Sequence, residues 1–269
     1  MRIASRLAII VGLALLPTVV LAGNSVTNSG AGISISNNVS GGGSVTQNIS
    51  VSGNTVQNNG GAGISVNNSV SGTGSTLGQT VNATNNTVSD NGGAGISVSN
   101  NADSGGTSTT SVTTSNNSIT NNGGGGVSVS NTATGTGSTA STTVSSTNDS
   151  ISNNTGAGIS TTNTASTGGT ATTSVTATGT SITGNTGAGS TGISVTNTNN
   201  GGVGTTATTS VDTSPGGNTL TGNGGSNPIV ATNNAPNGAV VVNRTNPGGN
   251  PSPISVTTGG TGTTTLILP

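Results

Sequence analysis

The sequence predicts an all-β protein built as a β-solenoid, in which about six coils of ~31 residues stack along one axis. The first observation is a repeated string, of which Asn86–Asn100 is the clearest copy. Its copies begin at Asn24, Asn54, Asn86, Asn117, Asp149 and Thr180. The second observation is that three series of aliphatic residues recur with the same period: Val26, Val56, Val88, Ile119, Ile151 and Ile182; Ile33, Ile64, Ile96, Val127, Ile159 and Ile193; and Ile49, Val81, Val112, Val144, Val175 and Val211. A fixed period held through so many copies is typical of a solenoid, because each coil buries its apolar face against its neighbours.

Composition supports a folded β-protein and excludes one class of partner. The 269 residues include 48 Gly but no aromatic residue, Cys or His, and the net charge is −1. Disordered chains usually combine low hydrophobicity with high net charge, and this near-neutral sequence rich in Thr, Ser and Asn does not fit that class. Its basic residues are Arg2, Arg6 and Arg244. Since so few cations cannot neutralise a phosphate backbone, we expect no nucleic-acid binding.

Residues Met1–Ala22 are predicted to be a signal peptide. Two arginines precede an apolar run from Ile9 to Leu21, and Val20-Leu21-Ala22 places small residues at the two positions that signal peptidase inspects. The alternative is a membrane anchor, but the run is shorter than the ~20 residues of a membrane span, and Pro17 interrupts it. We therefore expect cleavage after Ala22, a secreted or cell-surface protein, and no membrane span in the mature chain.

Each coil is expected to contain three short strands, because its three aliphatic series fall about 8, 16 and 7 residues apart. Examples of the first, second and third strand are Ser118–Thr120, Gly126–Ser130 and Thr110–Thr114. The intervening turn Asn121–Gly125 consists of residues that tolerate positive φ. At this corner we expect the following side chains to stack and to form hydrogen bonds between coils: Asn58, Asp90, Asn121 and Asn153.

The segments between the second and third strands vary most among the repeats. They are residues 38–43, 69–78, 101–106, 132–137 and 164–169, and they are rich in Gly. We expect them to loop out of the coil. A competing interpretation pairs the second and third strands as an antiparallel hairpin around each loop. We prefer the coil, because hairpins would not require all three aliphatic series to keep one common period.

The strings of the form N-[ST]-[VI]-x-[ND]-N-x-G-x-G-[IV]-S-[VI] resemble the secreted right-handed parallel β-helix repeat proteins of bacteria, the superfamily that includes pectate lyases. They extend from Asn24 to about Asp212. The resemblance implies a right-handed parallel β-helix, but it implies no particular activity, because function resides in sites rather than in folds.

The character of the chain changes after Asp212, where seven of the eight prolines lie. We divide the chain into the signal peptide (1–22), the repeat domain (23–213) and a C-terminal segment (214–269). That last segment contains a degenerate coil and spare apolar runs, and prolines suit edge strands and covers better than central strands. It is expected to cap the solenoid or to dock on a neighbour through these residues: Ala239, Val240, Val241, Val242, Leu266, Ile267 and Leu268.

Catalytic and metal-binding residues are scarce. The lyases of the resembled superfamily use clustered carboxylates for calcium together with a basic residue, whereas the periodicity separates the four carboxylates Asp90, Asp103, Asp149 and Asp212. There is no His or Lys to serve as a base. The string Gly92–Val98 superficially matches a calcium β-roll motif but has Ser97 where that motif needs Asp. We expect no enzyme activity, no cofactor and no metal.

The outward face of the third strands is the surface for which we predict a binding role. It is an uncharged hydroxyl array that resembles the Thr-x-Thr faces of ice-binding solenoids. The predicted array consists of Thr80, Thr84, Ser111, Thr113, Ser115, Thr143, Ser145, Thr147, Ser174, Thr176 and Thr178. The simpler interpretation is that Thr and Ser are good exposed β-residues, and hydroxyls such as Ser34, Ser65 and Ser97 recur on the second strand as well.

These observations predict a secreted, non-enzymatic structural protein. After cleavage the first coil would begin at Asn24 with no cap before it, and a bare sheet edge invites pairing with another chain. We therefore expect head-to-tail self-assembly into an extracellular fibre, matrix or adhesive component, with the chain itself as partner. The alternative function is binding to ice or to a polysaccharide surface through the hydroxyl array.

Overall fold

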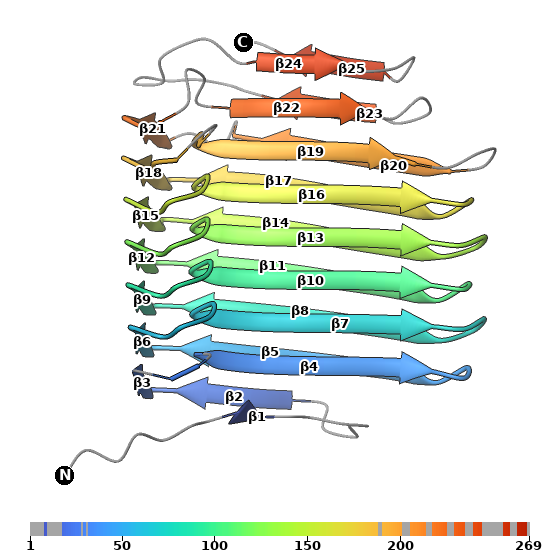
Figure 1. Ribbon diagram of the computed structural model, residues 1–269, viewed down its shortest axis with the longest axis horizontal. Helices are drawn as coiled ribbons and strands as arrows, with labels where there is room; N and C mark the ends of the chain where they lie inside the picture. The colour runs from blue at the N-terminus through green and yellow to red at the C-terminus, as the bar shows by residue number, and fades with distance from the viewer. Residues whose placement is uncertain are drawn as a thin grey trace.

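The computed structural model is a stack of coils whose strands form three parallel sheets (Figure 1). It describes residues 8–9, 18–27, 29–30, 32–187, 190–200, 205–213, 217–224, 229–234, 239–243, 255–258 and 263–267. Within these ranges every regular element is a strand, and no helix is long and apolar enough to cross a membrane. The predicted all-β solenoid is confirmed.

Two sheets contain nine strands each, and the third contains seven. Sheet A consists of β1 (Ala8–Ile9), β4 (Ile33–Ser40), β7 (Ile64–Ser71), β10 (Ile96–Asp103), β13 (Val127–Thr134), β16 (Ile159–Ser166), β19 (Ile193–Asn199), β22 (Ile229–Asn234) and β24 (Ser255–Thr258). Sheet B consists of β2 (Thr18–Ala22), β5 (Ser44–Ser52), β8 (Thr76–Thr84), β11 (Thr107–Ser115), β14 (Thr139–Thr147), β17 (Thr170–Thr178), β20 (Thr206–Asp212), β23 (Ala239–Asn243) and β25 (Thr263–Ile267). Sheet C consists of β3 (Ser25–Thr27), β6 (Thr55–Gln57), β9 (Thr87–Ser89), β12 (Ser118–Thr120), β15 (Ser150–Ser152), β18 (Ser181–Thr183) and β21 (Thr219–Thr221).

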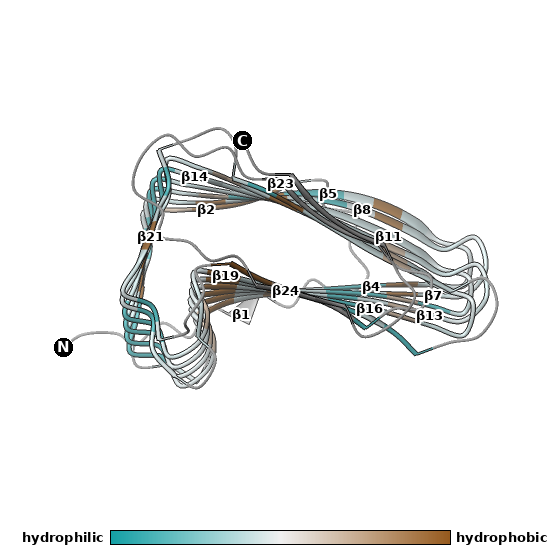
Figure 2. Ribbon diagram, turned by 90° about the horizontal axis from the view of Figure 1, so that it is seen from above, coloured by the Kyte–Doolittle hydropathy of each residue, from teal (hydrophilic) through white to brown (hydrophobic). Residues whose placement is uncertain are grey.

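The second and third strands of a coil belong to different sheets. β10 pairs in parallel with β7 and β13, and β11 pairs in parallel with β8 and β14. Sheets A and B face each other, and the short sheet C closes the wide end of the cross-section (Figure 2). The coil is therefore confirmed, and the antiparallel hairpin is wrong.

The long strands extend into the segments that were expected to loop out. Residues 101–103 are part of β10, and residues 132–134 are part of β13. The connection between β10 and β11 is only residues 104–106, which form a tight arch. Alternation explains the difference, because Ala102 and Ala133 continue the inward-facing set that begins with Ile96 and Val127, and both are fully buried.

Left-handed backbone conformations mark the corners of the coil. At the corner between sheets C and A they occur at Asn58, Asp90, Asn121, Asn153, Gly184 and Gly222. The hydrogen-bonded stack expected of Asn58, Asp90, Asn121 and Asn153 is not formed by these side chains, which are exposed. The hydrogen-bonded ladder belongs instead to the next residue in each coil: Asn59, Asn91, Asn122, Asn154 and Asn185, which are buried, and the partly exposed Asn223. A left-handed residue directs its own side chain outward, so the ladder is displaced by one position.

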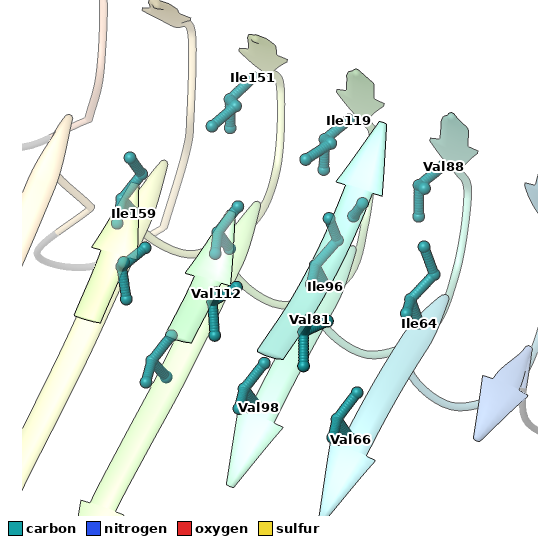
Figure 3. Packing of buried hydrophobic residues seen from close by; sticks show 14 of the residues in the cluster. Ile64, Val66, Val81, Val88, Ile96, Val98, Val112, Ile119, Ile151 and Ile159 are labelled. Atoms are coloured by element: carbon teal, nitrogen blue, oxygen red, sulfur yellow. The ribbon is translucent and has the colours of Figure 1, made fainter. Parts of the chain in front are cut away.

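The interior contains two apolar compartments. The larger lies beside sheet C, and all three predicted aliphatic series converge in it (Figure 3). The smaller lies beneath the arches and contains two separate clusters: one of Val39, Val70 and Leu77, and one of Ala102, Ala133, Ala140, Ala165, Ala171 and Ala207. The aliphatic series predict the first compartment but not the second, whose residues lie in or beside the segments expected to form loops.

A row of buried polar side chains, the polar seam, separates the compartments. Its sheet A members are Asn37, Asn68, Asn100, Asn131, Asn163 and Asn197, and its sheet B members are Gln47, Gln79, Thr110, Thr142, Thr173 and Thr209. The Nδ2 group of Asn131 donates to Oδ1 of Asn163 at 2.9 Å, and Thr142 Oγ1 donates to Asn131 Oδ1 at 3.1 Å. Hydrogen bonds of this kind offset the desolvation of the buried amides and fix the register of neighbouring coils.

Candidate functional site

The predicted hydroxyl array is one outward face of sheet B. Ser111 aligns with Thr80 and Thr143, and Thr113 aligns with Ser145, so the predicted residues form columns that run from coil to coil. Thr84, Ser115, Thr147 and Thr178 form the last column, at the C-terminal ends of the strands. Ser174 and Thr176 extend the inner columns by one coil. The structure therefore brings all eleven predicted residues together on one face.

The array is wider than the sequence analysis expected. Two further outward columns precede the predicted ones, and most of their members carry hydroxyls: Ser44, Thr76, Thr107, Thr139, Thr170 and Thr206; and Thr46, Gly78, Thr109, Ser141, Thr172 and Thr208. They were missed because these residues were assigned to loops or their margins. The signal that could have located them is the unbroken alternation from Thr107 to Ser115.

The geometry of this face is a regular grid. Neighbouring parallel strands lie ~4.8 Å apart and alternate residues of one strand lie ~6.6 Å apart. Viewed down the stack, the coils share one outline, and the strands of sheet B fan out toward the arches (Figure 2). Hydroxyls bond to one another along the columns: Thr76 Oγ1 donates to Ser44 Oγ at 2.8 Å, and Ser115 Oγ donates to Thr84 Oγ1 at 3.3 Å. From β8 to β17 the outward face of sheet B carries no charged side chain. The next strand, β20, ends at an acidic residue, Asp212, which aligns with Thr176.

The four carboxylates occupy different environments. Asp90 is exposed at a corner, Asp103 ends β10, Asp212 ends β20, and Asp149 is 1% exposed. Among the described residues, no group of three or more His, Cys, Asp or Glu side chains is placed to hold a metal ion.

Asp149 takes the place of an Asn in a second buried ladder. In that ladder Asn54 donates to Asn86, and Asn86 donates to Asn117, at 3.0 Å in each case. Oδ2 of Asp149 accepts from Thr114 Oγ1 at 2.6 Å and from Ser146 Oγ at 2.7 Å. In neighbouring coils the positions aligned with Thr114 and Ser146 are Val51, Ala83 and Ala177, so hydroxyls occur where the carboxylate needs donors. These bonds make Asp149 a structural member of the coil stack.

The C-terminal apolar strands continue the same stack. Val240, Val241 and Val242 lie on β23, which pairs with β20, and Ala239 begins that strand. Leu266 and Ile267 lie on β25, which pairs with β23. Leu268 lies outside the described residues. β24 and β25 are the last strands of sheets A and B, at the C-terminal end of the stack (Figure 1).

The other end is formed by residues predicted to belong to the signal peptide. β1 pairs with β4, and β2 pairs with β5, so two strands precede the first complete coil in the full chain. We expect a bare first coil only in the chain that remains after cleavage at Ala22, because cleavage removes β1 and β2. The full chain therefore ends in a strand edge at each end of sheets A and B, with β1 and β2 at one and β24 and β25 at the other.

Comparisons with known proteins add one structural likeness. No family model matches the sequence, and no curated protein matches it. The A-module of mannuronan C-5 epimerase AlgE6 from Azotobacter vinelandii is a similar solved structure, with a TM-score of 0.32 and 14% sequence identity. The match covers 89% of this chain and 65% of the epimerase module, so the chain spans less than two thirds of that module.

Proposed function

We propose that this chain is an exported structural protein that assembles head to tail into an extracellular fibre, matrix or adhesive component. The main support for this proposal is that the first and last strands of sheets A and B each pair on one side only, so each end of the stack has a strand edge without a partner strand among the described residues. The register of sheet B is continuous along the stack: the column of Ile49 and Val81 continues to Val211, Val242 and Leu266. An open edge with such columns is a template for another strand of the same pattern.

A non-catalytic role is part of this proposal. Its support is that the chain has no His, Lys or Cys and that Asp149 is fully engaged in the interior. Kinship with the pectate-lyase-like superfamily is also part of the proposal and rests on the repeated strings alone.

Electron microscopy and light scattering of the exported, purified protein test the proposal. Without β1 and β2, the eight remaining strands in each of sheets A and B give a single stack about 34 Å long. Assembly predicts rods several times that length and a scattering mass that rises with protein concentration. A folded protein that stays monomeric at all concentrations would exclude the fibre.

The hydroxyl grid of sheet B favours a second candidate, binding to an ordered surface such as ice or a crystalline polysaccharide. This candidate is supported by five outward columns of mostly hydroxyl-bearing, uncharged side chains that keep the same spacing from coil to coil. Thr113→Tyr would break this grid on sheet B, whereas Ser99→Tyr is a matched change on the outward face of sheet A. Selective loss of ice-recrystallisation inhibition or of polysaccharide retention in Thr113→Tyr would support this candidate, and equal behaviour of the two variants would exclude it.

A further inference from the structure

We propose that strand β2 of the predicted signal peptide occupies the place that the C-terminal strand β25 of a second copy takes after cleavage. The uncleaved leader (residues 1–22) would then block assembly, and its removal would permit it. This inference rests on the proposed head-to-tail assembly and specifies its interface, its register and its control.

The leader strand fits the first coil as a further turn of the solenoid. Val19 aligns with Ile49 and Leu21 aligns with Val51, and their exposed fractions are 8% and 7%. Between them Val20 points outward and is 64% exposed. Asn54 Nδ2 donates to the carbonyl oxygen of Leu21 at 2.8 Å, which extends the buried Asn ladder into the leader. Cleavage after Ala22 would remove all of these contacts.

The described strand of the leader does not extend as far as the polar seam. β2 begins at Thr18, which pairs with Asn48, so the described strand stops one residue short of Gln47. Gln79 Nε2 donates to Gln47 Oε1 at 3.0 Å, which continues the seam toward the N-terminal end. Gln47 is fully buried, and among the described residues its own Nε2 has no hydrogen-bond partner. A buried donor without an acceptor favours an additional strand at this edge.

The C-terminal strands of a second copy match both kinds of column. The register places Thr264 in the column of Thr209 and Gln47, and Leu266 in the column of Val211 and Ile49. In sheet A, Val256 shares the column of Ile35, and Thr258 shares the column of Asn37. Stacking β24 and β25 on the exposed β4 and β5 would thus place apolar residues on apolar ones. It would also place a hydroxyl opposite Gln47.

The second copy is favoured over another partner because its columns are those of the edge it would meet. The leader and the tail also meet one column: Val19 in the leader aligns with Ile49, and Leu266 in the tail lies in the column that begins at Ile49. A strand that competes for an edge must present the same alternation as the strand it replaces.

Cysteine cross-linking of the full chain tests the register, since the protein has no Cys of its own. Gln47→Cys combined with Thr264→Cys should give intermolecular disulfides, because neighbouring parallel strands lie ~4.8 Å apart, within disulfide range. The matched control combines Thr264→Cys with Asn48→Cys, one residue out of register and facing outward. To open the edge without cleavage, Val19→Asp and Leu21→Asp are added together. Val20→Asp is the matched control for that change, because Val20 already faces solvent.

We expect a ladder of cross-linked oligomers from the opened Gln47→Cys/Thr264→Cys chain, and its loss in the out-of-register control and in the Val20→Asp chain. Circular dichroism verifies that each variant is folded. If the opened variant does not fold, the same cross-linking is done on exported Gln47→Cys/Thr264→Cys protein after its leader has been removed.

Equal ladders of cross-linked oligomers from the chain with the native leader and from the Val19→Asp/Leu21→Asp chain would overturn the blocking role. Rods without a 47–264 disulfide would overturn the register, and both outcomes leave the proposed assembly intact. Monomers under all conditions would overturn the inference and the assembly together.

Discussion

Asn117 donates both its backbone N–H and its side-chain Nδ2–H to one carboxyl oxygen of Asp149, at 2.8 and 2.9 Å. The other carboxyl oxygen accepts from Thr114 and Ser146, so four donors from two coils converge on one buried group. A single side chain thus links the stack at a position where the preceding coils have Asn86 and Asn117 and the next coil has Thr180.

The first prediction concerns that group. Asp149→Ala should lower the free energy of unfolding by about 3 kcal/mol or more, because it leaves several buried donors without an acceptor. Asp149→Asn should cost clearly less, since Asn occupies the equivalent positions 86 and 117 and the hydroxyls of Thr114 and Ser146 can rotate to accept. Denaturant melts followed by circular dichroism measure both variants. Equal losses would mean that the hydrogen bonds to Asp149 contribute little.

The second prediction compares adjacent residues at a corner. Asn122 is buried, donates to Asn154 Oδ1 at 2.9 Å, and accepts from Asn91. Asn122→Leu should destabilise the fold by about 2–3 kcal/mol, because it removes a link in a buried ladder and leaves its partners unpaired. Asn121 is exposed with φ of 56°, so Asn121→Gly should be nearly neutral. A greater loss from Asn121→Gly than from Asn122→Leu would contradict the displaced ladder.

The same corner shows what the sequence could and could not predict. The period of the aliphatic series was sufficient for the coil, its three sheets and the parallel pairing, because this signal is shared by many coils. The position of the ladder depends on a single backbone conformation. Since Asn121 and Asn122 are the same residue type, composition does not distinguish the outward one from the buried one.

The polar seam was missed for a different reason. Asn100 lies between two polar neighbours, so it resembles a solvent-facing residue when considered alone. Counting by twos from Ile96 and Val98 places it on the inward face, followed by Ala102. Because residues 101–106 were expected to form a loop, this alternation was not followed beyond residue 100, although β10 continues to Asp103. The same assumption removed Thr107 and Thr109 from the hydroxyl array, while the columns from Ser111 to Ser115 were predicted correctly.

The third prediction tests the register of sheet B. Val112 is fully buried in the larger apolar compartment, whereas Thr113 is half-buried on the outward face. Val112→Asp should lower stability by about 3 kcal/mol or more, because it places an unpaired carboxylate in an apolar interior. Thr113→Asp should change stability by less than about 1 kcal/mol, since its carboxylate remains solvated. The melting temperatures of the two variants test this prediction. Similar melting temperatures would contradict the assignment of Val112 to the inward face and Thr113 to the outward face.

The fourth prediction concerns a glycine that permits close approach. Gly95 immediately precedes β10, and a Cβ at this position would collide with Cγ2 of Ile119 and lie 2.8 Å from the carbonyl oxygen of Gly126. Gly95→Ala should therefore force neighbouring coils apart and destabilise the fold by about 2 kcal/mol or more. Gly78 is the matched control: it faces outward on β8, and its Cβ would meet only Thr46 Oγ1, at 3.8 Å. Gly78→Ala should be neutral or stabilising by up to ~1 kcal/mol, because it reduces the entropy of the unfolded chain without strain. Melting curves in which Gly95→Ala is tolerated as well as Gly78→Ala would show that this corner can expand. The inter-coil contact at Gly95 would then not be what sets the spacing of the stack.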